Sequence, residues 1–70
     1  KMRYFENEDI IHINIKDGNE YSSIEMSPNI TVELNKENEI IGIEILNATN
    51  FIRDGLLETI QGRILQGERQ

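Results

Sequence analysis

Three carboxylates near the start of the chain are the first residues whose types and spacing could do chemistry. Glu6, Glu8 and Asp9 lie within four residues of one another, and carboxylate oxygens are ligands for calcium and magnesium. A dedicated calcium loop needs more ligands at fixed spacing and a glycine. We therefore interpret the three carboxylates as the solvated tip of a hairpin. Asp9 also opens the next expected strand, where we expect its side chain to accept backbone N–H bonds in a turn.

His12 is the only histidine and the next candidate for chemistry. Histidine is a common general base, but a base also needs a nucleophile or a substrate and a group that orients it. The serines lie in no nucleophile elbow or Ser-x-x-Lys context, and the glycines form no phosphate-binding loop. The sequence therefore predicts no catalytic residue, no cofactor and no metal site. A metal-dependent enzyme that uses His12 and the three carboxylates is the alternative.

The length and composition indicate one small domain. The chain has 70 residues and no cysteine, so disulfides and thiolate metal sites are excluded, and one histidine cannot build a structural zinc site. So short a chain has a thin margin of stability, which leaves oligomerisation as the stabilising device. The absence of cysteine fits a reducing cytoplasm.

No stretch approaches the ~18 apolar residues of a membrane span, and no signal peptide is visible, so we expect a cytoplasmic protein.

The net charge of −6 is unevenly distributed. Residues 1–46 carry four basic and ten acidic side chains, whereas residues 47–70 carry three of each. An acidic surface repels phosphates and is complementary to a basic partner. We therefore expect a basic protein as partner and no direct binding of nucleic acid.

The hydropathy pattern changes its period at residue 47. Before it, apolar and polar residues alternate in five stretches, 2–5, 10–15, 21–26, 30–34 and 40–46, which is typical of strands. Turn residues separate them, and Asn38 is the expected left-handed residue of the last turn. After it, Ile52, Leu56, Ile60 and Ile64 recur every four residues and predict an amphipathic helix that ends near Gly67. Its N-cap candidates are Asn47, Thr49 and Asn50.

The predicted fold class is α+β, with residues 1–70 as a single domain. Residues 1–46 form an antiparallel β-meander of four to five strands, and residues 47–70 form one C-terminal helix and a tail. We expect the helix to pack across the isoleucine-lined face of the sheet and the domain to be a homodimer or small homo-oligomer.

Glycines inside two predicted elements indicate contacts with another chain. Gly42 lies in the longest predicted strand, where glycine marks the close approach of another backbone or a bulge. Gly55 and Gly62 flank Thr59 on one side of the helix, and each glycine costs ~1 kcal/mol there against alanine. Packing against a strand or a partner helix would offset that cost, and a frayed helix is the alternative. The predicted partner-binding residues are Glu25, Glu33, Gly42, Glu44, Leu46, Phe51, Gly55, Thr59 and Gly62.

Two stretches carry a resemblance to a known family. One is the spacing of Tyr4, Asp9 and Ile13, and the other is the run Gly42-Ile43-Glu44-Ile45-Leu46-Asn47-Ala48. Over roughly residues 3–50 the chain resembles a family of short prokaryotic proteins of unknown function. Phe5 stands where the family usually has aspartate, and His12 stands at a usual aromatic position.

Some members of that family are encoded beside small RelE-like toxins, so the resemblance implies an antitoxin. In that hypothesis Glu25, Glu33 and Glu44 meet the basic RNA-binding cleft of a small ribonuclease. The apolar helix then serves the fold, a homodimer or the toxin contact. The alternatives are a self-assembling structural homo-oligomer and a small-ligand binder with a pocket between helix and sheet.

Overall fold

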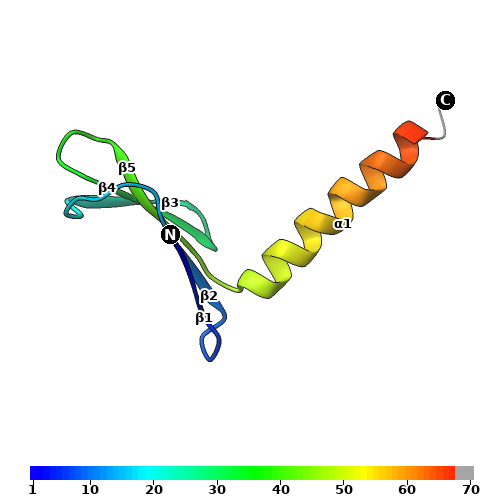
Figure 1. Ribbon diagram of the computed structural model, residues 1–70, viewed down its shortest axis with the longest axis horizontal. Coiled ribbons are helices and arrows are strands. Elements are labelled where there is room, and N and C mark those ends of the chain that lie inside the picture. The colour runs from blue at the N-terminus through cyan, green and yellow to red at the C-terminus, as the bar shows by residue number, and fades with distance from the viewer. Residues whose placement is uncertain (68–70) are drawn as a thin grey trace.

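The computed structural model describes residues 1–67 and contains five strands followed by one helix (Figure 1). The elements are β1 (Met2–Phe5), β2 (Ile10–Asn14), β3 (Ser22–Ser27), β4 (Ile30–Leu34), β5 (Ile40–Ile45) and α1 (Ala48–Gly67). All strand pairs are antiparallel. The predicted α+β class, an antiparallel sheet with one C-terminal helix, is confirmed. The part of the predicted tail in residues 68–70 lies outside the described residues.

The strand order is β1-β2-β5-β4-β3. A β1–β2 hairpin and a β3–β4–β5 meander are joined where β2 pairs with β5, through Ile11 opposite Ile45 and Ile13 opposite Ile43. The turn predicted at residues 17–19 therefore does not join neighbouring strands. It lies in the connection from β2 to β3, which passes β5 and β4 and reaches the opposite edge of the sheet. The two isoleucine-rich strands take neighbouring inner positions, where strands on either side shield their side chains from water.

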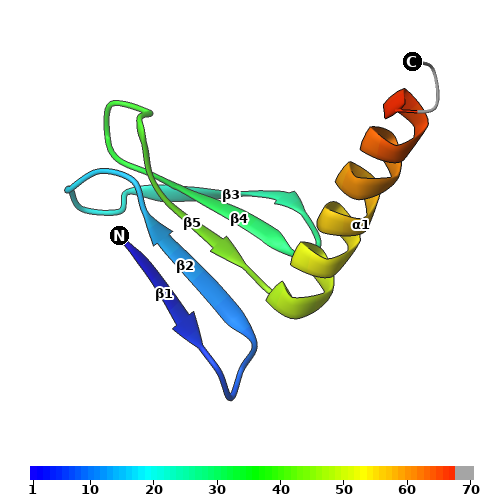
Figure 2. The same cartoon turned by 45° about the vertical axis from the view of Figure 1, so that its right-hand side comes forward.

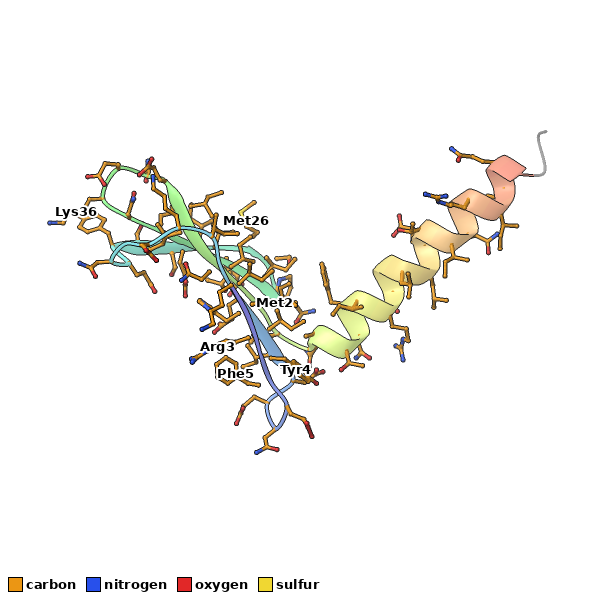
Figure 3. The ribbon with its side chains drawn as sticks, viewed as in Figure 1. Met2, Arg3, Tyr4, Phe5, Met26 and Lys36 are labelled. Atoms are coloured by element: carbon orange, nitrogen blue, oxygen red, sulfur yellow. The ribbon has the colours of Figure 1, made fainter. Side chains whose placement is uncertain are left out.

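The strand registers separate apolar from charged side chains. One row across the sheet is apolar in every strand and consists of Met2, Ile13, Ile43, Val32 and Ile24. The next row is polar in every strand and consists of Arg3, His12, Glu44, Thr31 and Glu25. Successive residues of a strand point to opposite faces, so we call these the apolar face and the polar face. The polar face also carries the apolar pair of Phe5 and Ile10. Figure 3 shows Met2 and Tyr4 on one side of β1 and Arg3 and Phe5 on the other.

The core is small because the sheet is a single layer. Ile11, Ile45 and Ala48 form its buried cluster, with Ile13 and Ile43 packed against them. At the β3 edge, a register shift between Glu25 and Ser27 leaves Met26 as an extra residue, a β-bulge. The helix contributes to the core only through Ala48, its one buried residue among those described.

The expected position of the helix needs correction. Figures 1 and 2 show α1 leaving the end of β5 and extending away from the sheet instead of lying across its isoleucine-lined face. Every described helix residue after Ala48 is exposed. Only Leu46 and Asn47 connect β5 to α1, and Asn47 adopts a left-handed φ of 50°. So short a connection sets the direction in which the helix leaves.

The loop between β4 and β5 is held by its own side chains. Asn35 accepts backbone N–H bonds from Glu37 and Glu39 at 3.0 and 2.9 Å. Glu39 accepts hydrogen bonds from Lys16 at 2.8 Å and from Asn35 at 2.9 Å, and both lower the pKa of its carboxyl, Lys16 most strongly. Asn38 has a φ of 64°, so its prediction as the left-handed residue is confirmed.

Replacing Asn38 with alanine should lower the free energy of unfolding by roughly 1 kcal/mol, since a left-handed backbone costs most side chains ~1–2 kcal/mol while asparagine tolerates it. Urea unfolding measures the change. Lys36→Ala in the same loop is the matched control and should change little. An Asn38→Ala protein as stable as the parent contradicts the expectation.

Candidate protein-binding surface

Asp9 anchors the start of the helix to the β1–β2 hairpin. Its carboxylate accepts hydrogen bonds from the Thr49 backbone N–H at 3.1 Å, the Thr49 hydroxyl at 2.8 Å and the Tyr4 hydroxyl at 2.9 Å. Its backbone carbonyl accepts the Ala48 N–H at 2.9 Å. Free N–H groups at a helix N-terminus need such acceptors. The cap therefore comes from a residue 40 positions earlier, and Asn47, Thr49 and Asn50 do not supply it with their own side chains.

The Asp9 carboxyl is held in its charged form. The hydrogen bond from the Thr49 hydroxyl is the main cause that lowers its pKa below the ordinary value of 3.8, helped by Tyr4 and the Thr49 amide and opposed by desolvation. A negative charge is also favourable beside the positive end of a helix dipole. The expected role of Asp9 as an acceptor of backbone N–H bonds is thus observed, but the donors are in the helix.

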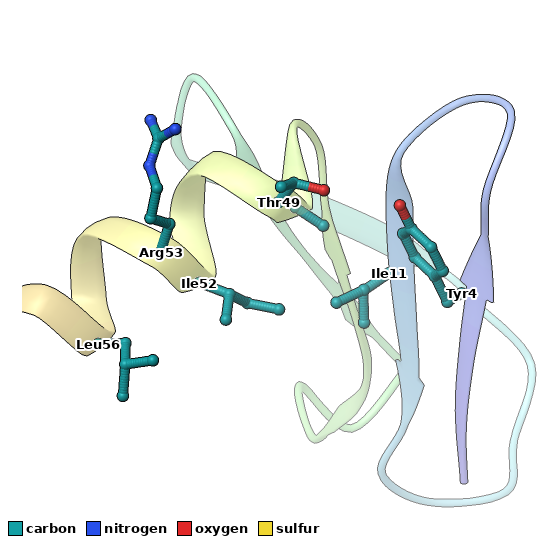
Figure 4. Close-up of a pocket in the computed structure, with 7 residues that line it drawn as sticks. Tyr4, Ile11, Thr49, Ile52, Arg53 and Leu56 are labelled. Carbon is teal, nitrogen blue, oxygen red and sulfur yellow. The ribbon is translucent and has the colours of Figure 1, made fainter.

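An open apolar cleft lies in the angle between the helix and the apolar face. Figure 4 shows Tyr4 and Ile11 on the sheet side and Ile52 and Leu56 on the helix side. Ala48 also lines the cleft, whose volume is about 480 Å³. We call this feature the helix–sheet cleft.

The apolar side chains of the helix are open to water along its length. Seven of them are between 44% and 58% exposed, namely Phe51, Ile52, Leu56, Leu57, Ile60, Ile64 and Leu65. Apart from the adjacent residues and the nearby backbone of the helix itself, no atom of residues 1–67 lies within 4 Å of a Cβ built on Gly55 or Gly62. The Thr59 hydroxyl donates to the Gly55 carbonyl at 2.9 Å. Packing against the chain's own strands therefore does not explain these two glycines.

The polar face brings together the other predicted residues. Glu33 hydrogen-bonds His12 at 2.9 Å. A Cβ on Gly42 would collide with the Glu33 carboxylate and lie 3.3 Å from His12 Nε2. Gly42 thus leaves room for this pair of side chains and adjoins a register shift between β4 and β5. Glu44 lies in the polar row opposite His12.

The predicted partner-binding residues fall into two separate groups. Glu25, Glu33, Gly42 and Glu44 are strand residues of the polar face, whereas Phe51, Gly55, Thr59 and Gly62 are exposed on α1. Leu46, half-buried, lies between the groups in the connection from β5 to α1, where its amide donates to the Asn29 carbonyl at 2.8 Å. The structure does not bring these residues into one site.

The carboxylate cluster separates in the structure. Glu6 and Glu8 are exposed in the turn of the β1–β2 hairpin, while the Asp9 carboxylate is engaged by the helix. Within residues 1–67, no group of three or more histidine and carboxylate side chains could hold a metal ion. In the same residues, no helix has the length and hydropathy that a membrane crossing requires.

A family model described as protein of unknown function (DUF2283) matches residues 1–48. The chain belongs to this family. The match spans the whole sheet and ends at the first residue of α1, so the exposed helix lies almost entirely beyond it. No curated protein and no solved structure matches the chain.

Sequence reasoning missed the contact between Asp9 and Thr49. The signal for it was present, since the spacing of Tyr4 and Asp9 carried the resemblance and Thr49 was a candidate cap. Hydropathy patterns and turn signals are local, so they could not show that two residues 40 positions apart are in contact. The family match contains Tyr4 and Asp9 but stops one residue before Thr49.

Removing the Thr49 hydroxyl should destabilise the start of the helix. We expect Thr49→Val to lower the free energy of unfolding by about 1 kcal/mol, the net worth of a typical hydrogen bond, as measured by urea unfolding. Thr31→Val makes the same chemical change inside a strand, where valine is favoured, and should cost nothing. Equal losses in both variants would show that the cap is not responsible.

The Asp9 anchor should weaken in acid. Because its folded pKa lies below the ordinary 3.8, its stabilisation is complete above that value and is lost as the pH falls through the folded pKa. Carbon-13 NMR titration of the Asp9 carboxyl should give a midpoint below 3.8. Thr49→Val should move the midpoint upward, and an unchanged midpoint would contradict the assignment of its main cause.

Proposed function

We propose that this chain is a non-catalytic, cytoplasmic protein-binding module that acts as an antitoxin-like inhibitor of a small basic ribonuclease. The observation that carries the protein-binding part of the proposal is the exposure of apolar side chains on α1, and the basic partner is proposed from the charge of the sheet. Monomeric soluble proteins rarely expose continuous apolar patches larger than a few hundred Å², and larger ones mark contacts with other molecules. Seven large apolar side chains on one helix are about half exposed, which supports a contact of α1 with another molecule.

The charge of the sheet supports a basic partner. Glu25, Glu33 and Glu44 lie on the polar face, where Arg3 and His12 share the row of Glu25 and Glu44. Lys1 lies opposite Asn14, which pairs with Gly42 in the row of Glu33. Complementary charge speeds association and selects against acidic partners. A basic RNA-binding cleft covered by this face would be closed to RNA, and binding alone would then inhibit the ribonuclease.

The alternative is a structural homo-oligomer whose only partner is another copy. The same exposed apolar surface supports it, because a short chain without disulfides gains stability by association. The two functions differ in what the polar face does. In an antitoxin it meets a basic protein, whereas in a homo-oligomer of this kind it stays in water.

Affinity capture from the native host tests the proposal. We expect tagged protein to retain a small basic protein at a one-to-one ratio and to release it as the salt concentration rises, because salt screens exposed charges. The purified partner should cleave RNA, and the chain should inhibit it. Capture of no basic protein, or turnover of a substrate by the chain alone, overturns the proposal.

A pair of charge variants locates the contact. Glu25→Gln with Glu44→Gln should weaken the complex about tenfold or more, since it removes two charges from the polar face. The control, Glu6→Gln with Glu37→Gln, removes the same charge from two exposed turns and should change affinity much less. Equal weakening by both pairs would show that only net charge matters.

A further inference from the structure

The helix–sheet cleft has two apolar walls that the chain cannot bring together. The helix would have to fold back to close it, but the Asp9 carbonyl holds the Ala48 amide and the Asp9 carboxylate holds Thr49. The Leu46 amide is held by the Asn29 carbonyl. Closure within one chain would break these contacts together, so the cover must come from elsewhere.

The apolar surface continues well beyond the cleft. The cleft is lined by helix residues only up to Leu56, and residues 57–67 extend the helix by roughly 16 Å at 1.5 Å per residue. This distal half carries Leu57, Ile60 and Ile64, which are 58%, 45% and 51% exposed. A small molecule in the cleft would leave these side chains in water. A protein segment that fills the cleft and also covers the distal half accounts for both surfaces.

We propose that the helix–sheet cleft of each chain is occupied by the distal half of α1 from a second copy, so that two chains exchange their helices reciprocally. This inference deepens the proposed function by assigning the apolar surfaces to self-association, which leaves the polar face for a basic partner. Each chain has one helix–sheet cleft and one exposed distal half of α1. In a two-fold symmetric exchange each distal half fills the cleft of the other chain, so the dimer is closed and no further copy can add.

The charges of the helix and of residues 1–46 favour this arrangement. The described helix carries two basic side chains, Arg53 and Arg63, and two acidic ones, Asp54 and Glu58, so helices of two copies meet without net repulsion. The excess negative charge of residues 1–46 includes the carboxylates of the polar face, and like charges placed opposite each other are unfavourable. Two copies are thus expected to meet through helix and apolar face.

Both the helix and the apolar face of the sheet offer exposed apolar side chains to a dimer interface. The exposed apolar side chains of the helix add to those of the apolar face, where Met2, Tyr4 and Ile24 are 66%, 51% and 49% exposed. Together they approach the ~800 Å² that each partner buries in an interface of standard size. Burial of this surface would also give a second layer to a sheet that has only one.

Sedimentation equilibrium of the pure 70-residue chain tests the exchange. We expect a particle of two chains over the micromolar to millimolar range. Ile60→Glu should weaken self-association at least about tenfold, because it places a charge in the apolar contact. Gln61→Glu adds the same charge at the neighbouring helix position and should change it less than about twofold. A monomeric parent protein, or equal effects of the two variants, overturns the proposal.

NMR on a mixture of carbon-13-labelled and unlabelled protein tests the geometry without any substitution. Contacts between chains should join helix methyl groups, such as those of Ile60 and Ile64, to Tyr4 and Ile11 of the other copy. Contacts between helices alone would overturn the exchange. Glu25→Gln with Glu44→Gln should leave the two-chain particle intact, so loss of the basic partner and loss of self-association are separate results.

Discussion

The hydrogen bonds between Asp9 and the first turn of the helix are the constraint on which the rest of the structure depends. They join two elements that are far apart in the sequence. Asp9 lies in the first hairpin and Thr49 lies in the helix, 40 residues later. They also satisfy N–H groups that a helix start otherwise leaves open. Since the anchor fixes where the helix begins and how it leaves the sheet, it also determines that the apolar face stays uncovered within one chain.

A single-layer sheet with an unpacked helix has little buried surface to stabilise it. Hydrophobic burial is the dominant favourable term in folding, and here it is concentrated in a cluster around Ile11, Ile45 and Ala48. The polar contacts described above therefore matter more than they would in a thicker domain. The His12–Glu33 pair on the polar face and the Lys16–Glu39 pair at the loop are two such contacts that join separate strands or connections.

The local features of the fold could be predicted from the sequence, and the long-range ones could not. Alternation of apolar and polar residues predicted four to five strands, and five are observed. The turn chemistry of asparagine predicted the left-handed Asn38. The pairing of β2 with β5 could not be read in the same way, because its strands are separated by two others in sequence. The four-residue spacing of isoleucine and leucine predicted the helix correctly, but the expected packing on the sheet was wrong, because the described helix residues after Ala48 are exposed. Likewise, Gly42 leaves room for the side chains of His12 and Glu33, which lie on the two strands that flank it. This could not be predicted before the strand pairing was known.

The bulge at Met26 affects how sheets of different molecules can meet. An edge strand presents unpaired N–H and C=O groups, and long flat edges invite strand-to-strand aggregation. At the β3 edge the extra residue interrupts the regular spacing of these groups, and a bulge increases the local twist. The opposite edge, β1, is only four residues long. Continuous sheets built edge to edge are thus disfavoured, which protects an isoleucine-rich chain from forming fibrils.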